Sequence, residues 1–182
     1  MADTMGLPLQ TEELTIRSLS EADWAIFLHL NTDAEVMKHV GSVNPETEVK
    51  ALFEQRLAPW EGKEGQWLSL AIEHSGTGEV IGLIGLKVHN LETGIVEIGF
   101  MLDMVQSGKG YGTQALSRFV KYAFYNLGFH KVTATCSIYN IASQRALEKN
   151  GFLKEGILRH NAMVDDHYID DCIYGLLAQD VV

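Results

Sequence analysis

The sequence predicts an α/β fold in which a mixed, mostly antiparallel sheet is flanked by helices. Three observations carry this prediction. Apolar residues alternate in three consecutive segments between residues 66 and 102, a pattern typical of an antiparallel meander. A glycine-rich turn and a long amphipathic helical pattern follow at 108–127. A β-branched segment at 130–138 comes after that helix, so the helical crossover should place it parallel to the strand before the helix.

The chain begins with a polar segment that carries a Gly and a Pro, and we expect residues 1–11 to form a flexible arm. A single domain is expected at 12–182, a length suited to one core. Alternation at 13–19 predicts its first strand. Ser20 followed by Asp23 has the capping-box spacing, with Asp in place of the usual Glu, and predicts the start of a helix.

Two further helices are expected before the meander. The first should begin at Asp33 and end near Gly41. The second should begin at Pro45, because proline suits the first turn of a helix, and should end at Pro59.

The three meander strands are separated by turn sequences. Strands are expected at 66–74, 79–89 and 95–102, joined by turns at 75–78 and 90–94. The middle strand is apolar at nearly every position, which predicts that it lies at the centre of the sheet.

The C-terminal third alternates helices and strands. The helix at 110–127 should end at Gly128, a suitable C-cap, and the segment 130–138 should form the next strand. A second helix is expected at 140–150, and two last strands at 152–162 and 168–178, with Asp165 and Asp166 in their turn.

The glycine-rich turn is the strongest functional signal. Gly108, Gly110 and Gly112 let the backbone turn sharply at a helix start, where free N–H groups favour a phosphate. The P-loop pattern fails because Lys109 is followed by Gly110 and not by Ser or Thr, and the dinucleotide pattern fails because Thr113 replaces the last Gly.

Charge and composition exclude several function classes. The net charge is −10, which disfavours nucleic acid and suits a cationic partner such as an amine or a basic peptide, although solubility alone also explains it. Cys136 and Cys172 are expected to be buried free thiols. The seven His residues show no metal-ligand spacing, so no metal site is expected. Without a signal-peptide pattern or an apolar run of membrane-spanning length, we expect a cytoplasmic protein that binds no membrane.

Several short motifs occur together in this order and resemble those of the GNAT acetyltransferases. The first predicted strand resembles the family motif L-x-I-R-x-L, and the strand before the glycine loop resembles V-E-I-G-F. The loop itself resembles G-x-G-x-G/A. The helix at 140–150 and the residues after it resemble N-x-A-S…E-K-x-G-F, and the last strand resembles Y-x-D…Y-x-L-L. The resemblance covers residue 12 to the C-terminus and is closest to the branch that includes the ribosomal-protein alanine N-acetyltransferases. It implies a splayed sheet of six to seven strands and acetyl-CoA as cosubstrate. Related enzymes are often dimers, so a homodimer stays open.

The sequence departs from the family pattern at two positions. Ser107 stands directly before G-x-G, where the family usually has Gln or Arg, and Gln106 lies one place earlier. Leu147 stands where many acetyltransferases have a Tyr that protonates the leaving thiolate, so another proton donor is needed.

The resemblance implies the following cofactor contacts. Backbone amides near Leu102, Asp103 and Met104 are candidates for the pantetheine and the oxyanion. Asn140 suits a pantetheine amide, or is only a helix N-cap. Lys109 is a candidate phosphate ligand, or a solvated lysine. The loop itself supplies Gln106 as a side chain and the amides of Ser107, Gly108, Lys109, Gly110, Tyr111, Gly112 and Thr113.

Two residues are candidates for proton transfer. Glu97 is the candidate base by its alternation in the strand, or else one partner of a cross-strand salt bridge. Ser143 is the candidate acid, or else bonds local backbone at the helix start. Tyr139 is a second candidate donor, or a packing residue.

Residues near the last strand pair are less specific. His160 and His167 are candidates for lining the acceptor site, or are surface histidines. Asp170 either orients a cationic substrate or ties the strand pair together, and we favour the second role.

The function expected is transfer of an acetyl group from acetyl-CoA to a primary amine by direct attack, with a protein N-terminal Ala or Ser as one acceptor class. A polyamine or an aminoglycoside-like amine is the alternative acceptor. A non-catalytic acyl-CoA-binding module and a nucleotide-binding enzyme are the alternative functions.

Overall fold

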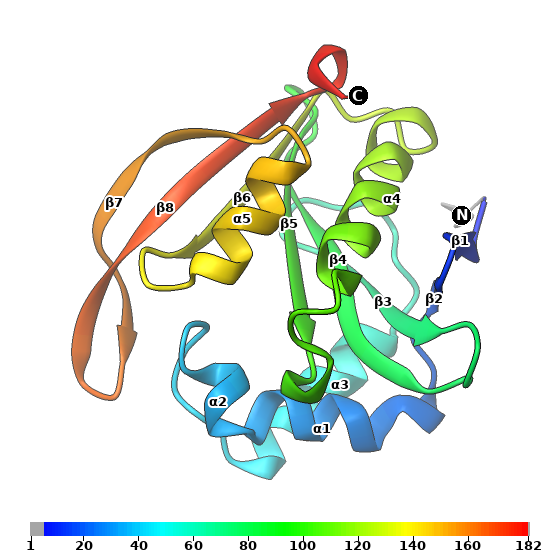
Figure 1. Cartoon of the computed structure of the whole chain (residues 1–182), viewed down its shortest axis with the longest axis vertical. Helices are drawn as coiled ribbons and strands as arrows, with labels where there is room; N and C mark the ends of the chain where they lie inside the picture. Colours follow the sequence, from blue (N-terminus) through cyan, green and yellow to red (C-terminus); the bar gives the residue numbers. More distant parts are fainter. Residues whose placement is uncertain (1–5, 182) are drawn as a thin grey trace.

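The computed structural model describes residues 6–181 and shows an eight-stranded sheet flanked by helices (Figure 1). The strand order is β1-β2-β3-β4-β5-β6-β8-β7, and every neighbouring pair is antiparallel except β5 and β6, which are parallel. The strands are β1 (Leu9–Gln10), β2 (Leu14–Ser18), β3 (Trp67–His74), β4 (Val80–Asn90), β5 (Ile95–Leu102), β6 (Lys131–Ser137), β7 (Leu153–Val164) and β8 (His167–Leu177).

The helices occur along the chain in the expected order. The α-helices are α1 (Trp24–Thr32), α2 (Ala34–Met37), α3 (Glu46–Leu57), α4 (Tyr111–Tyr125) and α5 (Ile141–Lys149). Short 3₁₀ helices are η1 (Glu21–Asp23), η2 (Met104–Gln106) and η3 (Ala178–Asp180). The predicted mixed α/β fold is confirmed, with both cysteines buried and free.

The sheet has one strand more than the expected six to seven, because β1 forms within the segment expected to be an arm. Leu9 pairs with Ile16 of β2, and the Leu9 side chain is fully buried. The expectation of an arm is therefore wrong for Leu9 and Gln10. The part of that arm at residues 1–5 lies outside the described residues.

Two hydrophobic clusters cover the two faces of the sheet. The larger one packs α4 against β2, β4, β5 and β6, with Phe119 and Leu116 fully buried. The smaller one joins α1 and α3 to Leu83 of β4, and the Phe27 and Phe53 rings within it lie 4.9 Å apart between centroids, tilted by 55°. β4 is apolar at nearly every position because it is covered on both sides.

The parallel strands β5 and β6 stay together only at one end. Ile95 to Glu97 pair with Lys131 to Thr133, and no later residue of β5 pairs with β6. β6 continues alongside β8 as far as Ser137 instead. The predicted splay is confirmed, and it leaves one edge of the second half of β5 without a strand partner among residues 6–181.

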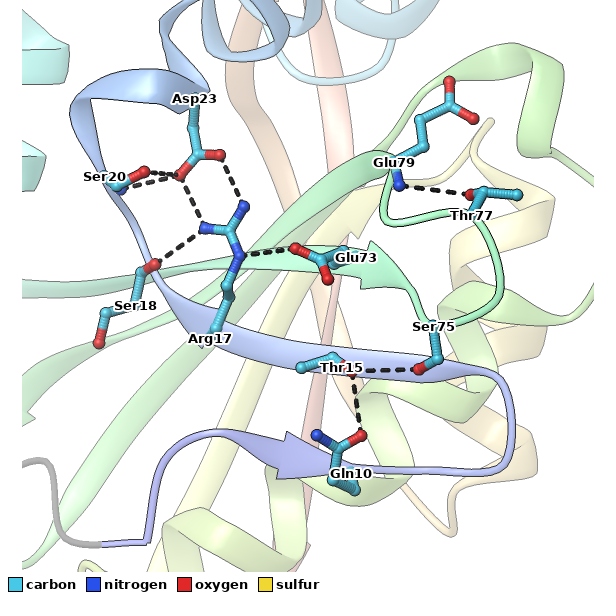
Figure 2. Close-up of polar contacts among 10 residues, drawn as sticks. All are labelled: Gln10, Thr15, Arg17, Ser18, Ser20, Asp23, Glu73, Ser75, Thr77 and Glu79. Carbon is cyan, nitrogen blue, oxygen red and sulfur yellow. Dashed lines mark hydrogen bonds and ion pairs between the residues drawn. The ribbon is translucent and has the colours of Figure 1, made fainter.

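A buried ion pair connects β2 to the start of the α1 region (Figure 2). Arg17 donates to both carboxylate oxygens of Asp23, at 2.9 Å each, and to Glu73 of β3 at 2.8 Å. Asp23 also accepts from the backbone N–H of Ser20 at 2.8 Å, as the capping-box spacing predicts. Asp23 is only 3% exposed, so this pair fixes where the chain leaves the sheet.

The second predicted helix is shorter than expected. Asp33 caps it through the amides of Glu35 and Val36, as predicted, but the helix ends at Met37 and not near Gly41. Val40 is 53% exposed, so it offers no burial to extend the helix.

Candidate active site

The glycine loop connects β5 to α4 and owes its shape to two left-handed residues. Gly108 and Gly110 have φ of +79° and +84°, which only glycine adopts without strain. A Cβ added at either position would meet no atom within 4 Å, so the backbone alone requires glycine there. Gly112 serves packing instead, because a Cβ there would lie 3.2 Å from Leu102 and 3.3 Å from Phe100.

The loop presents a row of free backbone donors at the start of α4. Among residues 6–181, no group accepts from the amides of residues 108–113. These amides stand at the positive end of the helix dipole. The amide of Ser107 is different, because it donates to the carbonyl of Met104 at 3.0 Å to close η2. The prediction that Ser107 offers its amide to phosphate is therefore wrong, and the row begins at Gly108.

The register of β5 decides which of its amides face the splay. The N–H of Asp103 donates to the carbonyl of Ile81 in β4 at 3.0 Å, so Asp103 cannot offer its amide as predicted. In an antiparallel pair of strands, the backbone groups of successive residues point alternately toward and away from the partner strand. Phe100 and Leu102 therefore direct their N–H and C=O groups away from β4, toward the gap left by β6. Leu102 therefore keeps its predicted position, and the Met104 amide has no acceptor among residues 6–181.

A surface pocket of about 560 Å³ lies beside the free amides. It is lined by Gly110 and Thr113, and by three cations, Arg118 and Lys121 of α4 and Lys149 of α5. Three cations around one pocket in a chain of net charge −10 suit a polyanion such as a diphosphate. Sequence reasoning missed these cations. The available signal was the spacing of three residues between Arg118 and Lys121 on the helix that follows the glycine loop.

The two side chains predicted to help bind the phosphate contact each other. Lys109 donates from Nζ to Oε1 of Gln106 at 2.9 Å. Lys109 is exposed, so its ammonium can also reach a bound anion. Their roles in cofactor binding stay predictions.

The start of α5 places Asn140 and Ser143 next to β6. Asn140 accepts the backbone N–H of Ser143 at 3.0 Å, which confirms its role as N-cap and leaves its amide NH₂ without an acceptor among residues 6–181. Burial raises the pKa of the Cys136 thiol of β6 to about 11. Leu147 is buried in the core, whereas Tyr139 is 64% exposed and does not pack as one reading expected.

Glu97 lies in a cross-strand ion pair. Its carboxylate contacts Nζ of Lys87 at 3.0 Å and Nε2 of His89 at 3.1 Å, both from β4. Burial acts to raise the pKa of Glu97, but Lys87 and then His89 outweigh that effect and lower it. Glu97 is therefore a carboxylate at neutral pH with 20% of its side chain exposed, and its role as a base stays a prediction.

The strand pair β7–β8 holds the remaining predicted residues. His160 has a left-handed φ of +50° and stacks on Tyr168, with ring centroids 5.3 Å apart. Asp170 accepts the backbone N–H of His160 at 2.7 Å, in agreement with the role we favoured for it. His167 is exposed, and its ring contacts the carbonyl of Asp165 at 2.7 Å.

Residues 6–181 lack two kinds of functional feature. They contain no group of three or more His, Cys, Asp or Glu side chains arranged to hold a metal ion. Their helices include none with the length and apolar character needed to cross a membrane.

Comparison with known proteins identifies the family. Residues 13–153 match the family described as acetyltransferase (GNAT) domain. An uncharacterized N-acetyltransferase of Bacillus licheniformis, p20, is 30% identical over 173 residues, covering 94% of this chain and 97% of that protein.

Solved structures agree on the fold. The spermidine N-acetyltransferase of Vibrio cholerae, in complex with CoA and spermine, superposes with a TM-score of 0.82 at 21% identity, covering 93% of this chain and 98% of that one. Mycobacterium smegmatis RimJ, in complex with CoA-disulfide, superposes with a TM-score of 0.79 at 20% identity, covering 91% and 82%. Taken with the free amides at the start of α4, these matches show that the chain belongs to the GNAT family and is an N-acetyltransferase.

Proposed function

We propose that this protein transfers the acetyl group of acetyl-CoA to a primary amine by direct attack. The observation that supports this most is the row of unpaired amides at residues 108–113, beside a pocket lined by three cations. Such a row matches a diphosphate, because each N–H can donate to a phosphate oxygen without a side chain. Arg118, Lys121 and Lys149 would neutralise the remaining negative charge.

The unpaired edge of β5 would hold the rest of the cofactor. When bound, acetyl-CoA supplies an activated acetyl thioester. The backbone groups of Phe100 and Leu102 face the splay and can pair with an amide-containing chain, as a neighbouring strand would. The Leu102 N–H is the candidate donor to the oxygen on which negative charge develops, and the NH₂ of Asn140 can donate to a pantetheine carbonyl from the other side of the gap.

Glu97 is the proposed base. The lowered pKa makes its carboxylate a weak base, so it suits an acceptor that is already partly neutral. An α-amino group has a pKa of about 7.7–8.0, whereas a lysine side chain has one near about 10.4. This difference favours the α-amino group of a peptide or amino acid over a lysine side chain.

Ser143 is the proposed acid. Leu147 has no proton to give, and Ser143 lies in the first turn of α5, which packs against β6. A hydroxyl in that position can pass a proton to the leaving thiolate while its own proton is replaced from water.

The acceptor class is proposed from the closing motifs and the family neighbours. The motifs resemble those of the ribosomal-protein alanine N-acetyltransferases, which supports a protein N-terminal Ala or Ser as acceptor. RimJ and a spermidine N-acetyltransferase share the fold, so a small-molecule amine is the second candidate.

Gly110→Asp tests the proposal at its main observation. A carboxylate about 4 Å from a phosphate near the surface costs about 4 kcal/mol, on the order of a thousandfold in affinity. Titration calorimetry with acetyl-CoA should therefore detect no binding to this variant. Gly128→Asp is the matched control, since Gly128 also has a left-handed φ, +76°, and open space at its Cβ, but follows the other end of α4.

Two outcomes contradict the proposal. Equal affinity of the Gly110→Asp variant and the wild type for acetyl-CoA would place the phosphate site elsewhere. Binding of acetyl-CoA without thiol release on any amine of a panel of peptides, amino acids and polyamines would remove the transfer step.

A further inference from the structure

A second pocket, of about 180 Å³, includes Trp67, which shares a face of the sheet with Glu97 through the register Trp67–Lys87–Glu97. It is formed where the end of α3, the segment after it, and the neighbouring ends of β2 and β3 meet. Arg56, Trp60 and Trp67 supply its large side chains, and Ser18, Ser69 and Leu70 belong to its strand walls. None of these residues has a part in the function proposed above.

Two hydrogen-bond donors of this pocket have no acceptor. The indole N–H of Trp60 is buried and has no partner among residues 6–181. Arg56 makes no hydrogen bond or ion pair in the same part of the chain, although the sequence holds 24 acidic residues. Buried donors are almost always satisfied in folded proteins, so the unsatisfied Trp60 indole indicates a missing acceptor in this pocket, beside the guanidinium of the partly exposed Arg56.

The Arg56 guanidinium is held in place by an aromatic ring. Its Cζ atom lies 4.7 Å from the centroid of the Trp67 ring. Burial lowers the pKa of Arg56 to about 10, so the group remains charged at neutral pH while it has lost part of its hydration. A desolvated cation with a fixed orientation favours an anion more than a solvated one does.

Trp67 also connects this pocket to the proposed base. The Trp67 ring of β3 reaches across β4 to Gly99 of β5. A Cβ added at Gly99 would lie 3.4 Å from this ring. Lys87, which contacts Glu97 at 3.0 Å, lies 5.4 Å from the ring centroid.

We propose that the pocket binds a carboxylate of the acceptor molecule, whose amine is placed on the Glu97 side of Trp67. This proposal rests on the proposed function and narrows its substrate class to amines that also carry a carboxylate. A carboxylate fits because the planar guanidinium can donate two parallel hydrogen bonds to it, and the indole N–H can donate a third. A polyamine offers this pocket only positive charge, which Arg56 repels.

Binding can be measured without turnover. N-Acetylglycine carries a carboxylate and no amine, and N-acetylglycinamide is its uncharged match. Titration of the full chain with each probe, followed by tryptophan fluorescence, should give a saturable change with the acid and none with the amide. An equal response to both probes would overturn the proposal.

Two variants separate the Arg56 contact from a general loss of charge. Arg56→Met should weaken binding of N-acetylglycine at least about tenfold, the loss expected for hydrogen bonds to a charged group. Lys63→Met removes one positive charge from a side chain that is 73% exposed and close in sequence, and should change nothing. An unchanged affinity in Arg56→Met would overturn the proposal.

The Arg56→Lys variant provides a second, more conservative test in case Arg56→Met does not fold. It keeps the charge and the aliphatic stem but loses the planar fork, so an intermediate affinity is expected if the variant shows the circular dichroism and melting temperature of the wild type. If the folded Arg56→Lys variant binds N-acetylglycine with the wild-type affinity, recognition of the carboxylate by the planar guanidinium is contradicted.

Acetylation assays complete the test, because they distinguish a failure of the carboxylate proposal from a failure of the proposed function. With acetyl-CoA, an amino acid should be acetylated with at least about tenfold higher kcat/KM than its amide, and Arg56→Met should abolish this preference. Preference for the amide or for a polyamine would overturn the carboxylate inference but leave the acetyltransferase intact. Inactivity on all amines, with intact N-acetylglycine binding, would contradict the proposed function alone.

Discussion

At the scale of single residues, Asp23 shows how strongly one buried charge depends on its partner. Burial acts to raise the pKa of Asp23, but hydrogen bonds from Arg17 and Ser20 outweigh that effect and lower it (Figure 2). Asp23→Asn should cost about 2 kcal/mol of unfolding free energy at pH 7, because it weakens hydrogen bonds to a charged carboxylate while Arg17 keeps Glu73 as a partner. Urea unfolding of both proteins measures this cost.

The same residue predicts a pH dependence. Because the folded-state pKa lies below the unfolded value of about 3.9, the contribution of Asp23 is fully present above that pH. It is lost as the pH falls through the folded-state pKa. The difference between wild type and Asp23→Asn should therefore shrink in unfolding experiments below about pH 4. A constant difference from pH 7 to pH 3 contradicts the ionic role of Asp23.

At the scale of an element, the cap of α5 can be separated from the proposed cofactor contact of Asn140. Asn140→Asp keeps an oxygen that accepts the Ser143 N–H, but it loses the NH₂ group. Asn140→Ala loses both and should cost about 1 kcal/mol of stability. Asn140→Asp should therefore retain the melting temperature of the wild type and lose affinity for CoA as much as Asn140→Ala does. If Asn140→Asp retains the wild-type affinity for CoA, then Asn140 acts only as the N-cap of α5.

Elements differ in how well their sequences predict them. The pattern of β5, the glycine loop and α4 is long and regular, so sequence alone predicts its limits to within a residue or two. β1 is only two residues long, too short for alternation to be recognised, and it is stabilised by burial of Leu9 under a distant helix. The amides of Ser107 and Asp103 were assigned wrongly for a related reason. Their hydrogen bonds to Met104 and Ile81 depend on the geometry of η2 and on strand register.

The residues that line the two pockets could not be predicted from the sequence for the same reason. Motifs predict the backbone donors of the loop because those donors are consecutive in sequence. Arg118 and Lys149 come from different helices, and Arg56 and Trp67 from a helix and a strand, so only packing brings them together. The sequence therefore predicts the fold and the glycine loop, whereas the residues proposed to select the acceptor are brought together only by packing.

At the scale of the whole molecule, a chain of net charge −10 is expected to bind a polyanion such as CoA, so local cations must outweigh the overall field. Lys121 lines the pocket beside the free amides, whereas Lys38 is an exposed lysine paired with Glu35 in α2. Replacing either with Ala makes the net charge more negative by the same amount. Any difference between the two variants therefore measures the local contact alone.

We expect Lys121→Ala to weaken CoA binding about two- to five-fold, the range for one solvent-exposed ion pair, and Lys38→Ala to leave it unchanged. Calorimetry at about 0.15 M salt is the appropriate measurement, since the Debye length there, about 8 Å, screens Lys38 more than a contacting lysine. Equal losses in both variants would mean that net charge controls affinity. No loss in either would mean that the amides of residues 108–113 hold the phosphates without help from this lysine, and that the pocket beside them serves another part of the ligand.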